Sequence, residues 1–237
     1  MNEFVDALRA SAYLLAFTGA GMDTESNLPD FRGAGGLWKK HDPRNLASTE
    51  ALHNNYELFQ EFYSQRIQNL SSVSPHRGHE ILARWEQEGL LKGIITQNVS
   101  GLHVQAGSKN VMELHGNIRH IYCENCGVDH EGEDFFAGVR CSCGGLLRPG
   151  VTLFGESLPQ EAFHQAMEEL SKADMILILG TSLEVFPAAR LPFMYPMKRA
   201  YVDLEAYADG RIEHVFKEKI GPFLETVDRS LEEYLKE

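Results

Sequence analysis

The sequence predicts an α/β protein, in which a parallel sheet carries helices on both faces and a small metal-binding lobe is inserted beside it. Two observations predict the sheet, because short apolar runs recur along the chain and amphipathic helical stretches lie between them. A single cluster of four cysteines predicts the lobe. The composition is that of a folded protein, since 43% of the 237 residues are hydrophobic and 24% are charged.

Four apolar runs are predicted to be buried strands, at residues 13–17, 93–96, 175–179 and 200–203. Another short apolar strand is expected just before His115. Ligands of such sheets bind beyond the carboxyl ends of the strands. Those ends are expected at residues 19–21, 97–98, 180–182 and 203–205.

Three amphipathic stretches predict the helices that cover the sheet. Their apolar side chains recur at helical spacing: Ile81, Leu82 and Trp85; Phe163, Met167 and Leu170 after Pro159; and Phe223, Val227, Leu231 and Leu235 after Pro222. Two segments interrupt the alternation of strands and helices. Residues 33–75 contain a glycine-rich loop and a predicted helix at 57–70, and residues 118–148 contain the cysteines. We expect these insertions to form the small lobe, and residues 1–32, 76–117 and 149–237 to form the large domain.

The cysteines form two close pairs, Cys123 with Cys126 and Cys141 with Cys143, and the rest of the chain has none. A disulfide framework would distribute its bridges through the fold. Four thiolates in two pairs suit a tetrahedral Zn²⁺ ion with all its positions filled, which predicts one structural zinc. The alternative is four free thiols on a loop.

The charge balance limits the classes of partner. With 22 Lys and Arg against 34 Asp and Glu, the formal net charge is −12, which argues against direct nucleic-acid binding. No apolar run approaches the roughly 20 residues that a membrane span needs, and the first residues do not resemble a secretory signal. We therefore expect a cytoplasmic protein with no membrane contact. A non-enzymatic zinc-ribbon module is disfavoured because acidic residues surround the cysteines.

Several residues at the predicted strand ends suit a nucleotide. Thr18-Gly-Ala-Gly21 suits a phosphate cradle, since glycine lets backbone N–H groups approach an anion, although a simple tight turn has the same sequence. Asp203 and Glu205 suit ribose hydroxyls, or are solvated strand ends. His115 is a candidate general base, with a structural histidine as the alternative.

Taken in order, these motifs resemble the sirtuin family over nearly the whole chain. The matching segments are Thr18-Gly-Ala-Gly-Met-Asp-Thr-Glu-Ser-Asn-Leu-Pro-Asp-Phe-Arg32, Thr96-Gln-Asn98, Gly101-Leu-His103, Glu113-Leu-His-Gly116, the four cysteines, Phe154-Gly-Glu156, Gly180-Thr-Ser-Leu183 and Pro187-Ala-Ala189. The resemblance implies a Rossmann-like domain and an NAD-dependent deacylase acting on acylated lysines of proteins. Its products would be nicotinamide and 2′-O-acyl-ADP-ribose. An NAD-consuming ADP-ribosyltransferase or NAD hydrolase stays open, and we expect a monomer or weak oligomer.

The resemblance also assigns roles to residues. His115 would be the general base and, with Asn98, the catalytic pair. The cofactor would contact Gly19, Ala20, Gly21, Asp23, Thr24, Phe31, Arg32, Trp38, Gln97, Asn98, Ser100, His115, Gly180, Thr181, Ser182, Asp203, Leu204, Glu205 and Phe223. The substrate would contact Tyr63, Arg66, Val151, Phe154, Gly155 and Glu156, with residues 151–156 pairing with its backbone as an added strand.

Three positions depart from the family pattern. The family usually has Asp at the position of Ser100, in the nicotinamide pocket, and Ser at the position of Asp23. We interpret these two as a paired exchange, in which the carboxylate comes from the other wall. The third is Asp203, where Asn is usual; a carboxylate still accepts hydrogen bonds from ribose.

The acyl group is suggested by Tyr63 and Arg66. Arg66 lies one helical turn from Tyr63, beside the apolar stripe of the predicted helix at 57–70. An internal carboxylate partner or a side chain extending to solvent is the ordinary explanation for such an arginine. The pair nevertheless resembles that of sirtuins with malonyl- and succinyl-lysine activity, as does Phe31-Arg-Gly-Ala34. Deacylation is therefore expected to include acidic acyl groups.

Overall fold

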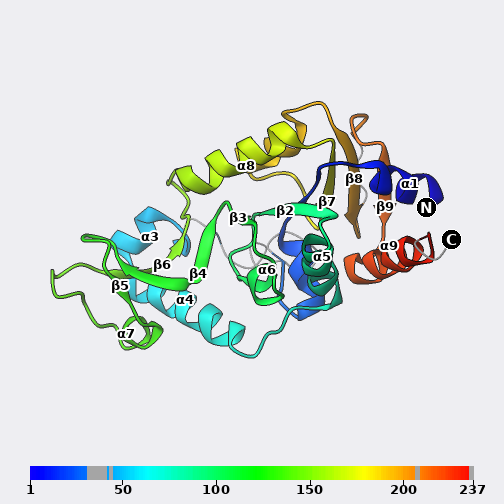
Figure 1. The fold of residues 1–237 in the computed structure, drawn as a ribbon. Helices are drawn as coiled ribbons and strands as arrows, with labels where there is room; N and C mark the ends of the chain where they lie inside the picture. The colour runs from blue at the N-terminus through cyan, green and yellow to red at the C-terminus, as the bar shows by residue number, and fades with distance from the viewer. Residues whose placement is uncertain (31–41, 43–44, 206–208, 235–237) are drawn as a thin grey trace.

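The computed structural model describes residues 1–30, 42, 45–205 and 209–234 (Figure 1). Its main sheet has the strand order β3-β2-β1-β7-β8-β9, and all neighbouring strands are parallel. The strands are β1 (Leu14–Thr18), β2 (Leu91–Thr96), β3 (Val111–Glu113), β7 (Met175–Leu179), β8 (Lys198–Asp203) and β9 (His214–Lys217). The predicted parallel sheet and its strands are confirmed, whereas β9 is an addition that the sequence analysis did not predict.

Alternating side chains of the central strands pack on opposite faces. Leu14 and Ala16 of β1 join one core with helices α1 (Asn2–Ala10), α5 (Arg77–Gln87) and α9 (Ile220–Tyr234). Leu15 and Phe17 join a second core with α8 (Gln160–Lys172) and η3 (Ala188–Phe193). Figure 1 shows α8 on one side of the sheet and α5 and α9 on the other. Helices on both faces were predicted, but α1 was not, and Leu235 lies outside the described residues.

The hydrogen-bond pattern of the sheet continues into the loops at its carboxyl edge. The Gly19 N–H donates to Leu179 O over 3.0 Å, and the Gln97 N–H donates to Thr18 O over 2.9 Å. The Gly180 N–H likewise reaches Val202 O over 3.0 Å. Three loops at this edge are therefore fixed by backbone contacts, so the side chains that they carry are held in place by the sheet itself.

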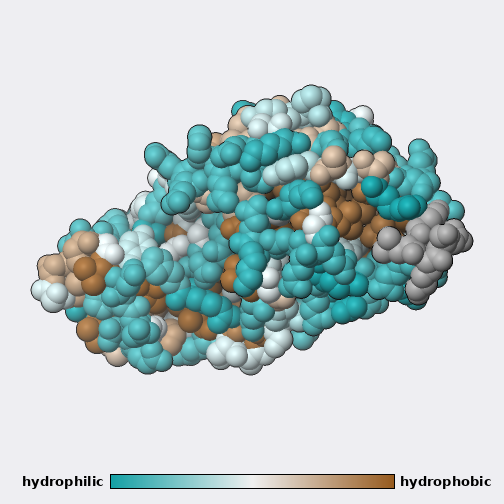
Figure 2. Space-filling view, in the orientation of Figure 1, coloured by the Kyte–Doolittle hydropathy of each residue, from teal (hydrophilic) through white to brown (hydrophobic). Residues whose placement is uncertain are grey.

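A second, antiparallel sheet lies beside the first. It has the order β5-β4-β6, formed by β5 (Asp129–His130), β4 (Gly116–Cys123) and β6 (Leu147–Val151). Helices α3 (Thr49–Asn54), α4 (Tyr56–Leu70) and α7 (Gly132–Phe136) share a third core with this sheet. The helix predicted at 57–70 is α4, and the domain boundaries set out above remain a prediction. Figure 2 shows hydrophilic residues over most of the visible face of the molecule, with scattered hydrophobic patches between them.

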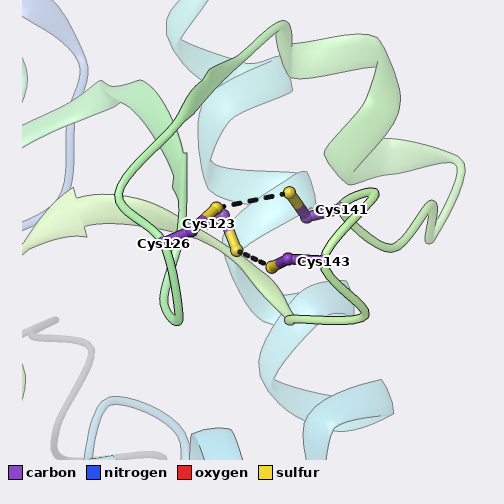
Figure 3. Close-up of side chains that lie close together, drawn as sticks. All are labelled: Cys123, Cys126, Cys141 and Cys143. Atoms are coloured by element: carbon purple, nitrogen blue, oxygen red, sulfur yellow. Dashed lines mark hydrogen bonds between the residues drawn. The ribbon is translucent and has the colours of Figure 1, made fainter.

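The four cysteine sulfurs meet at one end of this small lobe (Figure 3). Cys123 Sγ lies 3.5 Å from Cys143 Sγ, Cys126 Sγ lies 3.6 Å from Cys141 Sγ, and all four lie within 4.8 Å of one another. A tetrahedral ion with Zn–S bonds of about 2.3 Å needs sulfurs about 3.8 Å apart. The donor set therefore fits one Zn²⁺ ion, as predicted.

Within the described part of the chain, none of the helices is both long and apolar enough to cross a bilayer.

A substitution at Gly180 tests whether the two loops at the sheet edge are in close contact. Its φ is +62°, and an added Cβ would lie 2.3 Å from Met22 N. We expect Gly180→Ala to lower the free energy of unfolding, measured in urea, by roughly 3 kcal/mol through backbone strain plus the clash. Gly89→Ala is the matched control, because Gly89 has φ +78° and nothing within 4 Å of an added Cβ. Equal losses from both variants would contradict the close contact.

Metal removal tests the zinc assignment. Metal analysis should give one zinc per chain, because the four sulfurs are the full ligand set of a structural site. Cys143→Ser should lose the ion and let proteases cut the small lobe, since such a site supplies roughly 10–16 kcal/mol of apparent folding energy. Ser142→Ala, between two ligands, should keep the ion. A full-length, protease-resistant chain without zinc would rule out the assignment.

Candidate active site

A deep cleft follows the carboxyl edge of the main sheet and extends to the small lobe. It consists of two hollows of about 1520 and 940 Å³, which share six lining residues, including Ala20, Arg66 and Asn98. The larger hollow brings together most of the predicted site residues: Gly19, Ala20, Gly21, Thr24, Tyr63, Arg66, Gln97, Asn98, His115, Val151, Phe154, Gly155, Glu156, Gly180, Thr181, Ser182, Asp203, Leu204 and Glu205. The smaller one adds Asp23 and Ser100.

Among the described residues, one predicted cofactor contact does not line this cleft. Phe31, Arg32 and Trp38 lie outside the described residues, as does Ala34. Phe223 is described and is not brought to the cleft. It is completely buried, and its ring centroid lies 4.7 Å from that of Phe216 in the core, so its cofactor contact stays a prediction.

The glycines of the first loop have a different role from the one expected. An added Cβ on Gly19 would lie 2.6 Å from Thr181 Cβ, and one on Gly21 would lie 2.7 Å from Gly180 Cα. The N–H of Gly21 donates to Gly180 O over 2.8 Å, as that of Gly19 does to Leu179 O. These glycines therefore allow the two loops to pack together, and their own N–H groups point into that contact.

Thr181 connects three walls of the cleft. Its Oγ1 accepts hydrogen bonds from Gln97 Nε2 over 2.9 Å and from the Leu183 N–H over 3.2 Å. Its carbonyl accepts from the Tyr201 hydroxyl over 2.9 Å. The side chain of Gln97, which follows β2, is thus held against the loop after β7.

His115 lies in the connection between β3 and β4. Its Nδ1 is 2.9 Å from the carbonyl oxygen of Gln97. Because a carbonyl oxygen can only accept, Nδ1 carries a proton and the lone pair of the neutral ring lies on Nε2. The backbone beside the ring is equally constrained, since a Cβ on Gly116 would lie 2.0 Å from Gly150 O. The arrangement suits a general base whose accepting nitrogen is Nε2.

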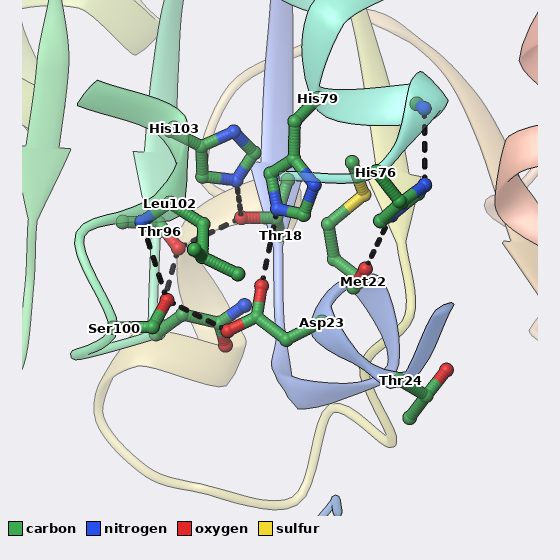
Figure 4. Close-up of polar contacts among 12 residues, drawn as sticks. Thr18, Met22, Asp23, Thr24, His76, His79, Thr96, Ser100, Leu102 and His103 are labelled. Atoms are coloured by element: carbon green, nitrogen blue, oxygen red, sulfur yellow. Dashed lines mark hydrogen bonds and ion pairs between the residues drawn. The ribbon is translucent and has the colours of Figure 1, made fainter. Parts of the chain in front are cut away.

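Asn98 is fixed by the same strand ends. Its side-chain amide donates to Gly19 O over 2.9 Å, and its backbone N–H donates to Thr96 Oγ1 over 3.0 Å. Thr18 Oγ1 donates to Thr96 Oγ1 over 2.8 Å and lies 3.0 Å from Nε2 of the buried His103 (Figure 4). Burial, together with the neighbouring His79 and His76, lowers the pKa of His103 well below its usual value. A neutral His103 therefore contacts Thr18, which in turn holds the Thr96 hydroxyl that accepts the Asn98 N–H.

Asp23 and Ser100 lie in direct contact, as their paired departure from the family pattern suggested. Ser100 Oγ donates to Asp23 Oδ2 over 2.8 Å, and His79 Nε2 donates to Asp23 Oδ1 over 3.2 Å. Both hydrogen-bonding side chains are almost completely buried. The carboxylate is therefore held from two sides at the edge of the smaller hollow, with His79 and Ser100 visible on either side of it in Figure 4.

At another point of the edge, Asp203 ends β8 and Glu205 follows it. Burial raises the pKa of Asp203, and its Oδ1 accepts the Glu205 N–H over 3.0 Å. Leu204 between them is 56% exposed. This acidic turn offers carboxylate acceptors to a ligand in the cleft, and both acids line it.

Tyr63 and Arg66 reach the cleft from helix α4. Tyr63 is buried, which raises the pKa of its hydroxyl to about 12. Burial also lowers the pKa of Arg66, partly offset by Tyr63, and the guanidinium lies 5.4 Å above the ring of Phe62. The pair puts a phenol and a partly desolvated cation at the place where the two hollows join.

Residues 151–156 form the wall opposite the sheet edge. The Phe154 N–H donates to Ala47 O over 2.8 Å, and its carbonyl accepts from the Thr49 N–H over 3.2 Å. Its side chain remains 41% exposed over the cleft. The backbone of Phe154 is therefore already paired with the chain's own residues.

The sequence analysis missed part of the lining. The additional residues come mainly from the loops before η3 and α9 and from the 3₁₀ helix η1 (Ala20–Ser26), and they include Glu25, Asn27, Val185, Phe186, Lys219 and Ile220. Phe186 is 64% exposed. An aromatic residue directly before a proline, next to a predicted strand end, is the one signal in the sequence that marks this segment.

Known proteins of similar sequence match most of this chain. An NAD-dependent protein deacetylase of Oceanobacillus iheyensis is 45% identical over 232 residues, covering 94% of this chain and 97% of that protein. One of Geobacillus kaustophilus is 43% identical, covering 95% and 96%. An NAD-dependent protein deacylase of Aeropyrum pernix is 44% identical over 188 residues, covering 78% and 77%.

Solved structures agree with these relatives. A Sir2 homologue in complex with NAD has a TM-score of 0.92 at 34% identity and covers 99% of this chain and 95% of its own. A Sir2 variant with a deacetylated p53 peptide and 3′-O-acetyl ADP-ribose also has a TM-score of 0.92, at 34% identity and with 97% and 98% covered. The Sir2 family model matches residues 19–187. This chain therefore belongs to the Sir2 family, the sirtuins.

Proposed function

We propose that the protein is an NAD-dependent protein lysine deacylase. It removes acetyl groups, and also succinyl and malonyl groups, from protein lysines and releases nicotinamide and 2′-O-acyl-ADP-ribose. The relatives named as deacetylases and the Sir2 complexes with NAD and with a peptide support this reading. The observation that carries it is His115, whose bond to Gln97 O directs the ring's lone pair to Nε2 inside the cleft.

The described residues suggest how NAD is held. Gln97 and Asn98 would contact the nicotinamide ribose, Gly180, Thr181 and Ser182 the adenosine half, and the acidic turn at Asp203 the ribose hydroxyls. Bound NAD supplies the ribose carbon that receives the acyl oxygen as nicotinamide leaves. His115 Nε2 then accepts the proton of a ribose hydroxyl, and the Gln97 carbonyl stabilises the resulting imidazolium through Nδ1–H.

The acidic acyl groups are proposed for the place where Arg66 and Tyr63 meet the cleft. Burial has already removed part of the solvation of this guanidinium, and a bidentate carboxylate supplies two charge-assisted hydrogen bonds to it. An acetyl group offers no such contact. The same site would therefore accept acetyl-lysine and favour succinyl-lysine. Cytoplasmic location and a monomeric or weakly associated state remain predictions.

One assay separates the candidate activities. The protein is incubated with NAD and with acetyl-, succinyl- or unmodified-lysine forms of one peptide, and nicotinamide and peptide mass are followed. The proposal requires nicotinamide release that depends on the acyl group and matches the loss of acyl mass. Release that is equal with the unmodified peptide would instead indicate an NAD hydrolase or ADP-ribosyltransferase.

His115→Ala tests the general base. We expect the deacylation rate to fall by about 10²–10⁴-fold, the usual contribution of a positioned base. His120→Ala is the matched control, because His120 is an exposed histidine of the adjoining strand β4 that pairs with Asp129. Its rate should stay within twofold of the original protein. A similar loss in both variants, or none in His115→Ala, would refute the role.

Arg66→Met tests the acyl preference. Losing a charged hydrogen-bonded contact worth about 1.5–3 kcal/mol should lower kcat/KM for the succinyl peptide by roughly 10–150-fold and leave the acetyl peptide nearly unchanged. Arg229→Met, on the exposed side of α9, is the control. If the ratio of succinyl to acetyl turnover is the same in Arg66→Met as in the original protein, Arg66 does not select the acyl group.

The Asp23–Ser100 contact gives a test of the proposed exchange. Asp23→Ser and Ser100→Asp, made singly, should each weaken exchange of free nicotinamide into NAD, since each disturbs one carboxylate site. The double variant restores one carboxylate and one hydroxyl, and should recover most of the loss because the two side chains are in contact. Additive losses in the double variant would show that the residues act independently.

A further inference from the structure

Arg148 is a buried cation that the proposed chemistry does not use. It lies in β6, next to the cleft wall at residues 151–156, and only 2% of the residue is exposed. Burying a guanidinium is costly unless its N–H groups find charged or strong acceptors. The acceptors that compensate for this burial therefore identify the segments of the small lobe that Arg148 connects.

One set of partners lies in the cleft wall. Arg148 Nη2 donates to Glu156 Oε2 over 3.0 Å and to Val151 O over 2.7 Å, and Nη1 contacts the other carboxylate oxygen. Glu156 Oε2 also accepts the Leu153 N–H over 2.7 Å. The carboxylate thus closes a turn over residues 153–156, in which Gly155 has φ +99°. Phe154 is carried over the cleft by this turn.

The other partner lies between two zinc ligands. Arg148 Nη1 is 3.3 Å from Oε2 of Glu124, which stands between Cys123 and Cys126. The same guanidinium lies 5.5 Å above the ring of Tyr122, the residue before Cys123. A single planar cation therefore contacts both the loop that carries two cysteines and the carboxylate that shapes the cleft wall.

We propose that Arg148 is a positioning residue for the protein substrate, which transmits the order of the zinc loop to the cleft wall at residues 151–156. The proposal rests on the proposed function, since it assigns that wall to the acyl peptide. The zinc ion, remote from the chemistry, then affects substrate affinity through Glu124, Arg148 and Glu156. Hydrogen bonds from Arg148 and from the Leu153 N–H outweigh burial and keep the pKa of Glu156 below its usual value.

Steady-state kinetics with an acetyl-lysine peptide test the proposal. Arg148→Met should raise KM for the peptide by about tenfold, as expected for a misplaced binding wall, with kcat and KM for NAD within twofold. Glu124→Gln should raise it by about threefold with full zinc content, and it keeps the proposal testable if Arg148→Met does not fold. Arg140→Met is the control, because Arg140 is an exposed arginine of the same lobe that donates to Gly144 O. Its peptide KM should not change.

Hydrogen exchange of the free protein gives a readout that needs no activity. The Leu153 amide should exchange at least tenfold faster in Arg148→Met, and faster than in the original protein in Glu124→Gln, whereas the Thr152 amide, which donates to His115 O, should change less. Unchanged peptide KM and unchanged Leu153 exchange in both zinc-loaded variants would overturn the proposal. A parallel fall in kcat with loss of zinc would also overturn it, by showing a general structural role. If the unsubstituted protein shows no deacylase activity, the proposed function is refuted. The role of Arg148 is then still tested, because hydrogen exchange at Leu153 reports on the connection between the zinc loop and the cleft wall without any activity.

Discussion

The whole cleft depends on one constraint, the parallel alignment of β1, β2, β7 and β8, which end together at one edge of the sheet. Backbone hydrogen bonds continue beyond the strands, from Gly19 to Leu179 and from Gly180 to Val202, so the loops begin in fixed positions. Gly21 and Gly180 lie where the loops after β1 and β7 approach most closely, and their lack of a side chain allows the contact. The sheet therefore positions the loops that carry the functional side chains, and these loops need few stabilising contacts of their own.

The chemistry follows from what this edge presents. A carbonyl at the end of β2 determines which nitrogen of His115 carries the proton, and buried threonines and His103 support Asn98 from below. The side-chain carboxyl group of Asp23 is held by His79 and Ser100 at the edge of the smaller hollow. The small lobe contributes the opposite wall, and Arg148 joins that wall to the loop that carries two of the zinc ligands.

The sequence was sufficient where the signal is local. Buried apolar runs predicted β1 and β7, and cysteine spacing predicted the sulfur cluster. Contacts between distant segments were predicted only where the family resemblance pointed to them, as for Asp23 and Ser100. Nothing in the sequence shows that His79 donates to Asp23, 56 residues away. Phe223 shows the limit of the apolar pattern, since helical spacing predicted the core helix but not that this side chain is completely buried. Glycines 19 and 21 were correctly located at the edge, but their close packing against residues 180–181 depends on tertiary structure alone.

The protonation of His115 shows whether the carbonyl at the strand end orients this ring as a base. In ¹H–¹⁵N spectra of the protein labelled at histidine nitrogens, at a pH where the ring is neutral, we expect a protonated Nδ1 and an unprotonated Nε2 for His115, identified by comparison with His115→Ala. This is the reverse of His103, whose Nε2 faces Thr18 Oγ1 and should carry the proton. A His115 ring protonated at Nε2 while neutral would contradict the account, because its accepting nitrogen would then be the one directed at the Gln97 carbonyl.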